Sequence, residues 1–404
     1  MGNKPRIRFK GFNDDWEQCK LGDIATFSKG NGYSKSDLAP SGEPIILYGR
    51  LYTNYETTIR NVDTFVELKD KSVISQGSEV IVPASGETAE DISRASVVKN
   101  QGIIIGGDLN VIKVNHLLNP TFLALTISNG EQQKELSKRA QGKSVVHLHN
   151  SDLQEVNLTF PLLNEQKEIS SLFEKMDSVI TLHQCKLEKL KLTKKALLQK
   201  LFPKNGKHIP EIRFKGFTDA WEQRKLDSLG KIITGNTPST SKKEYWSPNS
   251  DGVVWITPTD INSIKTQCSE RLLTKDGASQ ARIVPANSIL VTCIASIGKN
   301  TINTVEAAFN QQINALVPHF SNSYFILTML NNMESAFKRV AGTSATSIIN
   351  KKEFGQLSAL LPEIEEQNKI GRIFELIDNN ITLHQRKLER LQEVKKGLLQ
   401  KMFV

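Results

Sequence analysis

The sequence contains a long internal duplication, and this duplication constrains the fold more than any other feature. Residues 5–21 and 210–226 are identical at thirteen of seventeen positions, and residues 182–202 and 383–403 at fourteen of twenty-one. Between these shared segments the two halves differ widely, so two related frames carry two different inserts. A duplicated chain of this kind favours a pseudo-two-fold arrangement, as a homodimer does.

The length of the chain predicts several domains, because 404 residues are too many for one ordinary core. Hydrophobic residues make up 38% and charged residues 24%, which is typical of a folded globular protein. The repeat predicts a first domain (1–160), a central helix (161–202), a linker (203–211), a second domain (212–361) and a C-terminal helix (362–404).

Each half ends in a segment whose apolar residues step by alternating fours and threes, the spacing of a coiled-coil seam. The first copy of the seam contains Met176, Ile180, His183, Leu187, Leu190, Lys194, Leu197 and Leu201. The second copy contains Ile377, Ile381, His384, Leu388, Leu391, Lys395, Leu398 and Met402. A pseudo-two-fold axis predicts that the two helices pair in antiparallel orientation, so we expect the central Leu187 and Leu388 to be buried.

The two inserts predict mixtures of strands and helices. Strand-like runs cover 44–48, 80–83 and 102–114 in the first insert, and 252–257, 288–296 and 308–317 in the second. One helix-like segment follows in each, at 120–139 and 322–340. The predicted fold class is α+β, with two mixed α/β domains joined by two long helices that form an antiparallel coiled coil in a pseudo-two-fold chain.

The charge of the chain favours a polyanionic partner such as nucleic acid, because 52 Lys and Arg exceed 43 Asp and Glu. Segments 185–201 and 386–402 carry +5 and +4, which together equal the net charge of +9. These cations either contact phosphates or cover solvated helix ends, where they favour the helix dipole. His183 and His384 are either metal ligands or pH switches, or polar seam residues that fix the register.

A basic turn is repeated in both inserts, at Lys138-Arg139 and Lys338-Arg339, each followed by Gly and Ser. Residues that read bases should differ between domains that read different sequences, whereas phosphate contacts need not differ. We therefore interpret this turn as a phosphate contact; the alternative is a helix end with cations in its last turn and a glycine cap.

In the second insert, small turn residues at 234–240 are followed by lysines and aromatic residues, and the first insert has a looser analogue at 29–35. The candidate DNA contacts from both regions are Lys29, Asn31, Tyr33, Lys35, Lys138, Arg139, Lys143, Ser144, Asn236, Ser239, Lys242, Lys243, Lys338, Arg339, Thr343 and Ser344. Trp246 and Trp255 either lie beside these contacts in a groove or pack beneath the turn. Trp16 and Trp221 belong to the shared frame and are predicted core residues.

Motifs of catalysis are missing from the sequence. It contains no Pro-Pro dipeptide, no G-x-G-x-x-G run, no C-x-x-C pair and no nucleophile with a matched base. Residues 147–149 read His-Leu-His, a possible metal pair, but Ser-Ile-Ile stands at 347–349 in the second copy. No signal peptide or membrane-length apolar run is present. We expect no catalytic residue, metal site or cofactor, and a reducing cytoplasm.

Several segments resemble the specificity (S) subunit of type I restriction-modification systems. They are the paired openings at 16–24 and 221–226, TGNTPSTSKKEYWSPNSDGVVWITPTDI, PANSILVTCIASIGKN, AAFNQQINAL, LPEIEEQNKI and PLLNEQKEI. The resemblance covers nearly the whole chain. The first insert departs more, since residues 85–88 and 107–110 only approximate the second pattern.

The resemblance implies that two target-recognition domains read a bipartite, asymmetric site in double-stranded DNA. It also implies docking of two methyltransferase (M) subunits, which methylate adenine N6 with S-adenosylmethionine, and of restriction (R) subunits that use ATP and Mg. The S subunit itself is then no enzyme. A coiled-coil scaffold with protein-binding domains is the alternative. A self-contained DNA enzyme is disfavoured by the missing motifs.

Overall fold

The computed structural model describes residues 4–142, 145–204, 206–248, 251–341 and 348–403, which form two compact units. The first unit comprises residues 1–184 and 386–404, and the second comprises residues 185–385. Each of the two long helices therefore contributes residues to both units.

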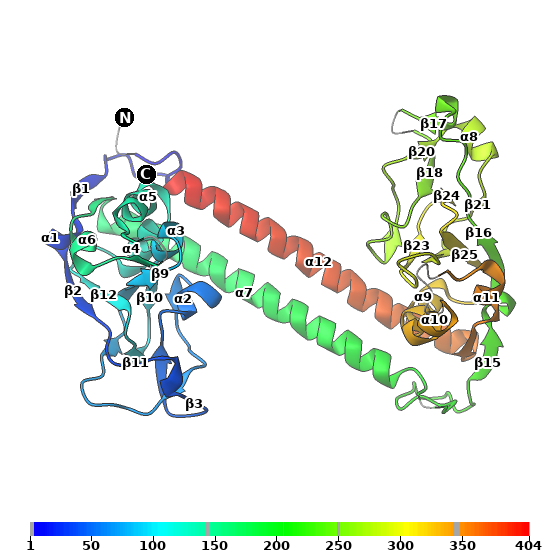
Figure 1. Ribbon diagram of the computed structural model, residues 1–404, viewed down its shortest axis with the longest axis horizontal. Helices are drawn as coiled ribbons and strands as arrows, with labels where there is room; N and C mark the ends of the chain where they lie inside the picture. The colour runs from blue at the N-terminus through cyan, green and yellow to red at the C-terminus, as the bar shows by residue number, and fades with distance from the viewer. Residues whose placement is uncertain (1–3, 143–144, 205, 249–250, 342–347, 404) are drawn as a thin grey trace. The chain divides into compact units, whose positions relative to one another are not determined.

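The first unit contains two mixed five-stranded sheets (Figure 1). One has the order β2 (Ala25–Lys29), β12 (Leu109–Val114), β8 (Glu79–Pro83), β10 (Ser96–Val98), β5 (Thr58–Ile59). The other has the order β3 (Leu38–Ala39), β6 (Phe65–Val66), β4 (Glu43–Ile46), β11 (Gln101–Ile105), β7 (Ile74–Gln76). The β5–β10 and β4–β11 pairs are parallel, and the other neighbours are antiparallel.

The second unit repeats this topology strand for strand. Its first sheet has the order β16 (Gly230–Thr234), β25 (Ile313–Pro318), β22 (Ile289–Thr292), β23 (Asn300–Asn303), β19 (Lys265–Thr266). Its second has the order β17 (Trp246–Ser247), β20 (Leu272–Leu273), β18 (Val253–Ile256), β24 (Ala307–Phe309), β21 (Ile283–Val284). The parallel pairs, β19–β23 and β18–β24, fall at the same places. The divergent inserts therefore share one fold.

Shorter elements complete each unit. Two-stranded pairs join β1 (Glu17–Lys20) to β14 (Asn157–Phe160), β15 (Glu222–Lys225) to β26 (Ser358–Leu361), and β9 (Ser85–Gly86) to β13 (Val146–His147). Short helices are α1 (Leu21–Ile24), η1 (Lys35–Asp37), α2 (Arg50–Thr53), α3 (Ala89–Ile92), α6 (Asn150–Gln154), η2 (Leu226–Ser228), η3 (Lys243–Tyr245), α8 (Lys275–Ser279) and α11 (Lys351–Gln356). The β1–β14 and β15–β26 pairs thus join each shared opening to the strand before a long helix.

Two predicted strands are each divided in the structure. The run 102–114 is β11 and β12, separated by a turn in which Asp108 adopts φ 59°. The run 308–317 spans β24 and β25, with a turn at 310–312. The two strands of each run belong to different sheets, so continuous apolar sequence here marks a crossing between sheets.

Each predicted single helix is also wrong, because both are two helices. Segment 120–139 forms α4 (Pro120–Ile127) and α5 (Gly130–Arg139), and segment 322–340 forms α9 (Ser323–Asn331) and α10 (Glu334–Ala341). The first break follows from Asn129, which is extended, and Gly130, which has φ 70°. All residues of α4 after Pro120 are buried, while α5 is mostly polar, so the break separates a core helix from a surface helix.

The predicted core tryptophans are confirmed. Trp16 is 3% exposed in the core of the first unit, and Trp221 is 1% exposed in the core of the second. Their surroundings correspond, because Trp16 meets Phe122 edge to face at 5.8 Å, and Trp221 meets Phe325 at 5.8 Å. The shared frame therefore repeats its packing as well as its sequence.

The shared arginine of each opening binds the start of a long helix. The helices are α7 (Leu163–Lys200) and α12 (Ile364–Met402). Arg8 donates through Nε and Nη2 to the two oxygens of Glu165, at 2.8 and 2.6 Å. Arg213 does the same to Glu366, at 3.0 and 2.7 Å. Both carboxylates are 1% exposed, so each pair is a buried, bidentate ion pair.

The two long helices run antiparallel within each unit. In the first unit, Phe173 of α7 packs near Phe403 and Asp177 pairs with Lys395 of α12, so the two helices advance in opposite directions. In the second unit, Lys194 pairs with Asp378 at 2.6 Å. Asp177 is equivalent to Asp378 in the repeat, and Lys194 is equivalent to Lys395. The two ion pairs therefore join the same two positions with the helices exchanged, as a two-fold relation requires.

The seam positions named above are all buried or half-buried. Leu187 is 7% exposed, whereas Leu388 is only half-buried, so full burial of Leu388 was a wrong expectation. His183 and His384 are half-buried. Seam residues Lys194 and Lys395 differ from the leucines because each reaches an aspartate of the other helix.

The end of each long helix enters the core of a unit. In the first unit, the centre of the Phe403 ring lies 5.8 Å from that of Phe122 and 6.0 Å from that of Phe173. In the second unit, the centre of the Phe202 ring lies 5.6 Å from that of Phe325 and 6.1 Å from that of Phe374. The helix of each copy thus supplies a core phenylalanine to the unit that contains the other copy's insert.

Candidate nucleic-acid interface

The turn after β16 of the second unit is held by side chains inside the protein. Asn236 donates from Nδ2 to the carbonyl oxygen of Gln280 at 2.7 Å, and its Oδ1 accepts the backbone N–H of Arg282 at 2.7 Å. Both polar groups of the amide are therefore occupied. Asn236 fixes the turn, which argues against its predicted role as a direct DNA contact.

Ser239, Lys242 and Lys243 lie exposed on the same turn. Lys242 donates to the hydroxyl of Tyr245 at 3.2 Å and lies 5.1 Å from the centre of its ring. Lys243 begins η3. The structure thus brings the predicted cations onto one exposed turn beside an aromatic ring.

Trp246 and Trp255 pack beneath this turn. Trp255 is 3% exposed, and its ring meets that of Trp246 edge to face at 5.0 Å. Arg271, which precedes β20, lies over Trp246 and was missed from the sequence. No periodicity could have revealed it, because only the pairing of β17 with β20 brings the two segments together.

The corresponding turn of the first unit differs in chemistry. Tyr33 is 7% exposed, and its hydroxyl accepts the backbone N–H of Lys69 at 2.7 Å, so it is a core residue rather than the predicted DNA contact. Asn31 donates to the carbonyl oxygen of Lys71 at 3.0 Å. Lys29 and Lys35 remain exposed.

The cation beside Tyr33 is already neutralised. Lys69 Nζ lies 4.8 Å from the centre of the Tyr33 ring and donates to Asp37 Oδ1 at 2.5 Å. This hydrogen bond, with those from Ser34, lowers the pKa of the Asp37 carboxyl to about 2. The two units thus place different cation–aromatic pairs beside equivalent turns.

The repeated basic pairs occupy the last turns of α5 and α10. Arg139 donates from Nη2 to Glu135 at 2.9 Å and to the carbonyl oxygen of Glu155 at 3.0 Å. Lys338 pairs with Glu334 at 2.6 Å, and Arg339 is exposed. Lys138 is also exposed. The pairs therefore match in position but differ in their contacts.

The glycine cap considered for α5 is wrong. Ala140 is the C-cap and is extended, while Gly142 has φ 136° beyond it. Gln141 instead bridges to His147 as the chain reverses. Lys143, Ser144, Thr343 and Ser344, which complete the predicted turns, lie outside the described residues.

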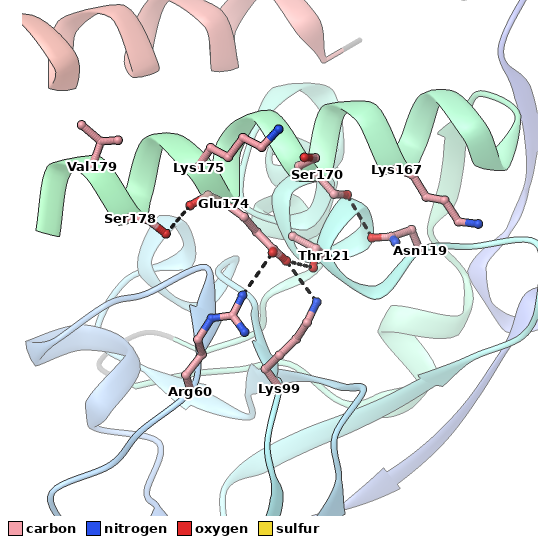
Figure 2. Close-up of a pocket in the computed structure, with 11 residues that line it drawn as sticks. Arg60, Lys99, Asn119, Thr121, Lys167, Ser170, Glu174, Lys175, Ser178 and Val179 are labelled. Carbon is pink, nitrogen blue, oxygen red and sulfur yellow. Dashed lines mark hydrogen bonds and ion pairs between the residues drawn. The ribbon is translucent and has the colours of Figure 1, made fainter. Parts of the chain in front are cut away.

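Glu174 of α7 joins the first unit's sheet to the helix (Figure 2). It accepts hydrogen bonds from Thr121 at 2.9 Å, Lys99 at 3.1 Å and Arg60 at 3.2 Å. Burial raises the pKa of this carboxyl, but these donors and cations outweigh it and hold the pKa below its usual value. The equivalent Glu375 of α12 pairs with Lys265 at 2.6 Å.

The Glu174 contact borders a groove of about 500 Å³ in the first unit. Figure 2 shows Lys167 and Lys175 on α7 along the same groove. At the place of Thr121, the second unit has Tyr324, whose hydroxyl donates to Asp378 at 2.8 Å. Each long helix thus contributes an equivalent carboxylate, Glu174 from α7 and Glu375 from α12, whereas each insert supplies its own cations.

The described part of the chain holds no cluster of metal-ligating side chains. No group of three His, Cys, Asp or Glu side chains suited to a metal lies there. The rings of His147 and His149 lie 6.4 Å apart, and the His149 backbone N–H donates to Asp152 at 2.8 Å. Within the same residues no helix is long and apolar enough to cross a bilayer.

A family model described as the type I restriction modification DNA specificity domain matches residues 13–192 and 218–393. The chain belongs to this family. Its two matches coincide with the two copies of the repeat. As a specificity-domain protein it serves recognition of DNA sequence and not catalysis.

Individual relatives agree with this family. The chain is 31% identical over 194 residues to the type I restriction enzyme HindI specificity subunit of Haemophilus influenzae, covering 45% of this chain and 40% of that one. It is 32% identical over 174 residues to the EcoR124I/EcoR124II specificity subunit of Escherichia coli, covering 40% and 42%. These matches span less than half of either relative.

Longer matches cover nearly the whole specificity-domain chain. It is 21% identical over 402 residues to the putative MjaX specificity subunit of Methanocaldococcus jannaschii, covering 96% of this chain and 92% of that one. The crystal structure of the type I restriction-modification S subunit from M. genitalium superposes with a TM-score of 0.67 at 14% identity, covering 99% of both chains. That likeness confirms the predicted fold class.

Proposed function

We propose that the chain is the specificity subunit of a type I restriction-modification complex and reads a bipartite, asymmetric site in double-stranded DNA. The first target-recognition domain (1–160) reads one half-site, and the second (212–361) reads the other. The helices 161–202 and 362–404, with the linker 203–211, connect the two domains along the chain.

One observation carries this proposal: the two units share a single strand topology but differ in the side chains around equivalent turns. The first has Lys69 on Tyr33, and the second has Arg271 on Trp246. Two domains with the same fold but different polar side chains in their loops are expected if each recognises a different DNA sequence. Base contacts must change with the sequence, whereas the fold that supports them need not.

The proposal extends to the partners of the complex. Two methyltransferase subunits dock on the chain and methylate adenine N6 with S-adenosylmethionine, and restriction subunits use ATP and Mg. The chain itself holds no cofactor and works in the cytoplasm.

Domain replacement tests the proposal. Residues 22–150 are exchanged for those of another specificity subunit, and the methylated motif is sequenced in cells that express the matching methyltransferase. We expect one half of the motif to change. A change in both halves, or in neither, would contradict two independent readers. A gel shift with and without the methyltransferase distinguishes a protein scaffold, which would retard no DNA.

A further inference from the structure

In the second unit, Arg271 lies on a platform of two tryptophans. Its guanidinium carbon is 3.7 Å from the centre of the Trp246 ring and 5.1 Å from that of Trp255. Each indole N–H is tied to the exposed turn: Trp246 donates to the carbonyl oxygen of Ser239, and Trp255 to that of Asn236, both at 3.2 Å. The platform therefore holds the arginine beside the turn that carries Lys242.

The guanidinium of Arg271 has no acceptor among the described residues. The side chain is exposed, and among the described residues its guanidinium makes no hydrogen bond or ion pair. Its bonded groups there are those of the main chain: the backbone N–H donates to Ser269 Oγ at 3.3 Å, and the carbonyl oxygen accepts the backbone N–H of Trp255 at 3.1 Å. By contrast, Arg282 donates to the carbonyl oxygen of Thr234 at 2.7 Å, and Arg224 to Glu222 at 2.6 Å. The planar guanidinium of Arg271, with its several N–H donors, is thus held in place by stacking on the tryptophan rings and not by hydrogen bonds to acceptors.

We propose, on the basis of the proposed function, that Arg271 reads a guanine in the second half-site. In the major groove guanine offers two acceptors, O6 and N7, which match two parallel N–H donors of one guanidinium. Adenine and cytosine offer an amino donor there, which a guanidinium cannot accept. Contacts that read bases should differ between the units, and Lys69 in the first is already bound to Asp37.

The test uses the full chain assembled with its methyltransferase. We compare Arg271→Ala and Arg271→Lys with Arg224→Ala, an exposed arginine of the shared frame, as the matched control. Methylated motifs are sequenced, and binding is measured on duplexes in which each position of the second half-site is varied. Melting curves check that each variant is folded.

Both Arg271 variants should lose preference for guanine at one position of the second half-site by roughly 5- to 150-fold, since a good bidentate contact discriminates by this much. Lysine should not restore the preference, because it lacks the planar fork. The first half-site should be unchanged, and Arg224→Ala should keep the whole motif.

Two results would overturn the inference while the proposed function stands. If Arg271→Ala keeps the motif and its affinity, the arginine only covers the tryptophans. If Arg271→Ala weakens binding to all sequences and Arg271→Lys restores it, the contact is to a phosphate. If the unaltered complex has no defined motif, the proposed function itself fails, and the inference fails with it.

Discussion

Arg8 and Arg213 explain why the openings of the two copies are so alike. Each binds a glutamate at the start of a long helix with two hydrogen bonds, and each also donates from Nη1 to a backbone carbonyl at 2.7 Å. These contacts leave little of the guanidinium unpaired. The shared opening is therefore a structural element that joins each copy's first residues to its long helix.

The Glu165→Gln variant tests this role. Removing one charge of a buried pair leaves the other uncompensated, so we expect the free energy of unfolding to fall by about 3–5 kcal/mol. Glu131→Gln is the control, because Glu131 pairs with Lys134 where both side chains are 66% exposed, and should cost at most about 1 kcal/mol. Urea denaturation measures both. Equal losses would contradict a structural role for the buried pair.

Glu174 gives the first unit a dependence on pH. Its pKa is lowered in the folded state, so its contribution to stability is present above the ordinary value of 4.5 and is lost as the pH falls through the folded pKa. Glu174→Gln should therefore melt lower near neutral pH and lose less on acidification. Melting temperature against pH measures this, and parallel curves for the two proteins would refute it.

At the scale of elements, the two long helices are joined by ion pairs that exchange equivalent positions. Lys395→Asp should destabilise the first unit, because it places two aspartates together. Adding Asp177→Lys should restore most of the loss, since the pair is then reversed. The same exchange at Lys194 and Asp378 should restore less, because Asp378 also accepts the Tyr324 hydroxyl. Thermal melting of the single and double variants measures the coupling.

We expect different effects from the aligned arginines at the ends of α5 and α10. Arg139 has two acceptors within its own unit, so Arg139→Ala should lower the melting temperature and leave the salt dependence of DNA binding unchanged. Arg339 is exposed, and Arg339→Ala should reduce the slope of log K against log salt by about 0.9. An unaltered slope for Arg339→Ala would exclude a phosphate contact there.

Much of the frame could be predicted from sequence because it is periodic or repeated. The heptads located the seam, and the duplicated openings located both core tryptophans. The divided helices could not be predicted from apolar spacing, because α4 is buried on all sides and has no exposed polar face. Tyr33 was misjudged and Arg271 was missed for a related reason: their partners, Lys69 and Trp246, lie far away in sequence and are brought close only by the sheets.

At the scale of the whole molecule, each unit depends on a phenylalanine from the far end of a long helix. Phe403→Ala should destabilise the first unit by about 3–5 kcal/mol, and Phe202→Ala the second. Hydrogen exchange of peptides from each insert separates the two effects. Equal loss of protection in both units from either variant would show that they unfold as one.

The position of Phe403 has a consequence for the order in which the protein is made. Domains usually fold as they leave the ribosome, the N-terminal one first. Here the core around Trp16 lacks residues 402 and 403 until the second insert has been translated, whereas the core around Trp221 already has Phe202. The first unit, whose insert is synthesised first, is thus completed last. Until residues 402 and 403 have been translated, part of its hydrophobic core stays exposed while the second unit folds.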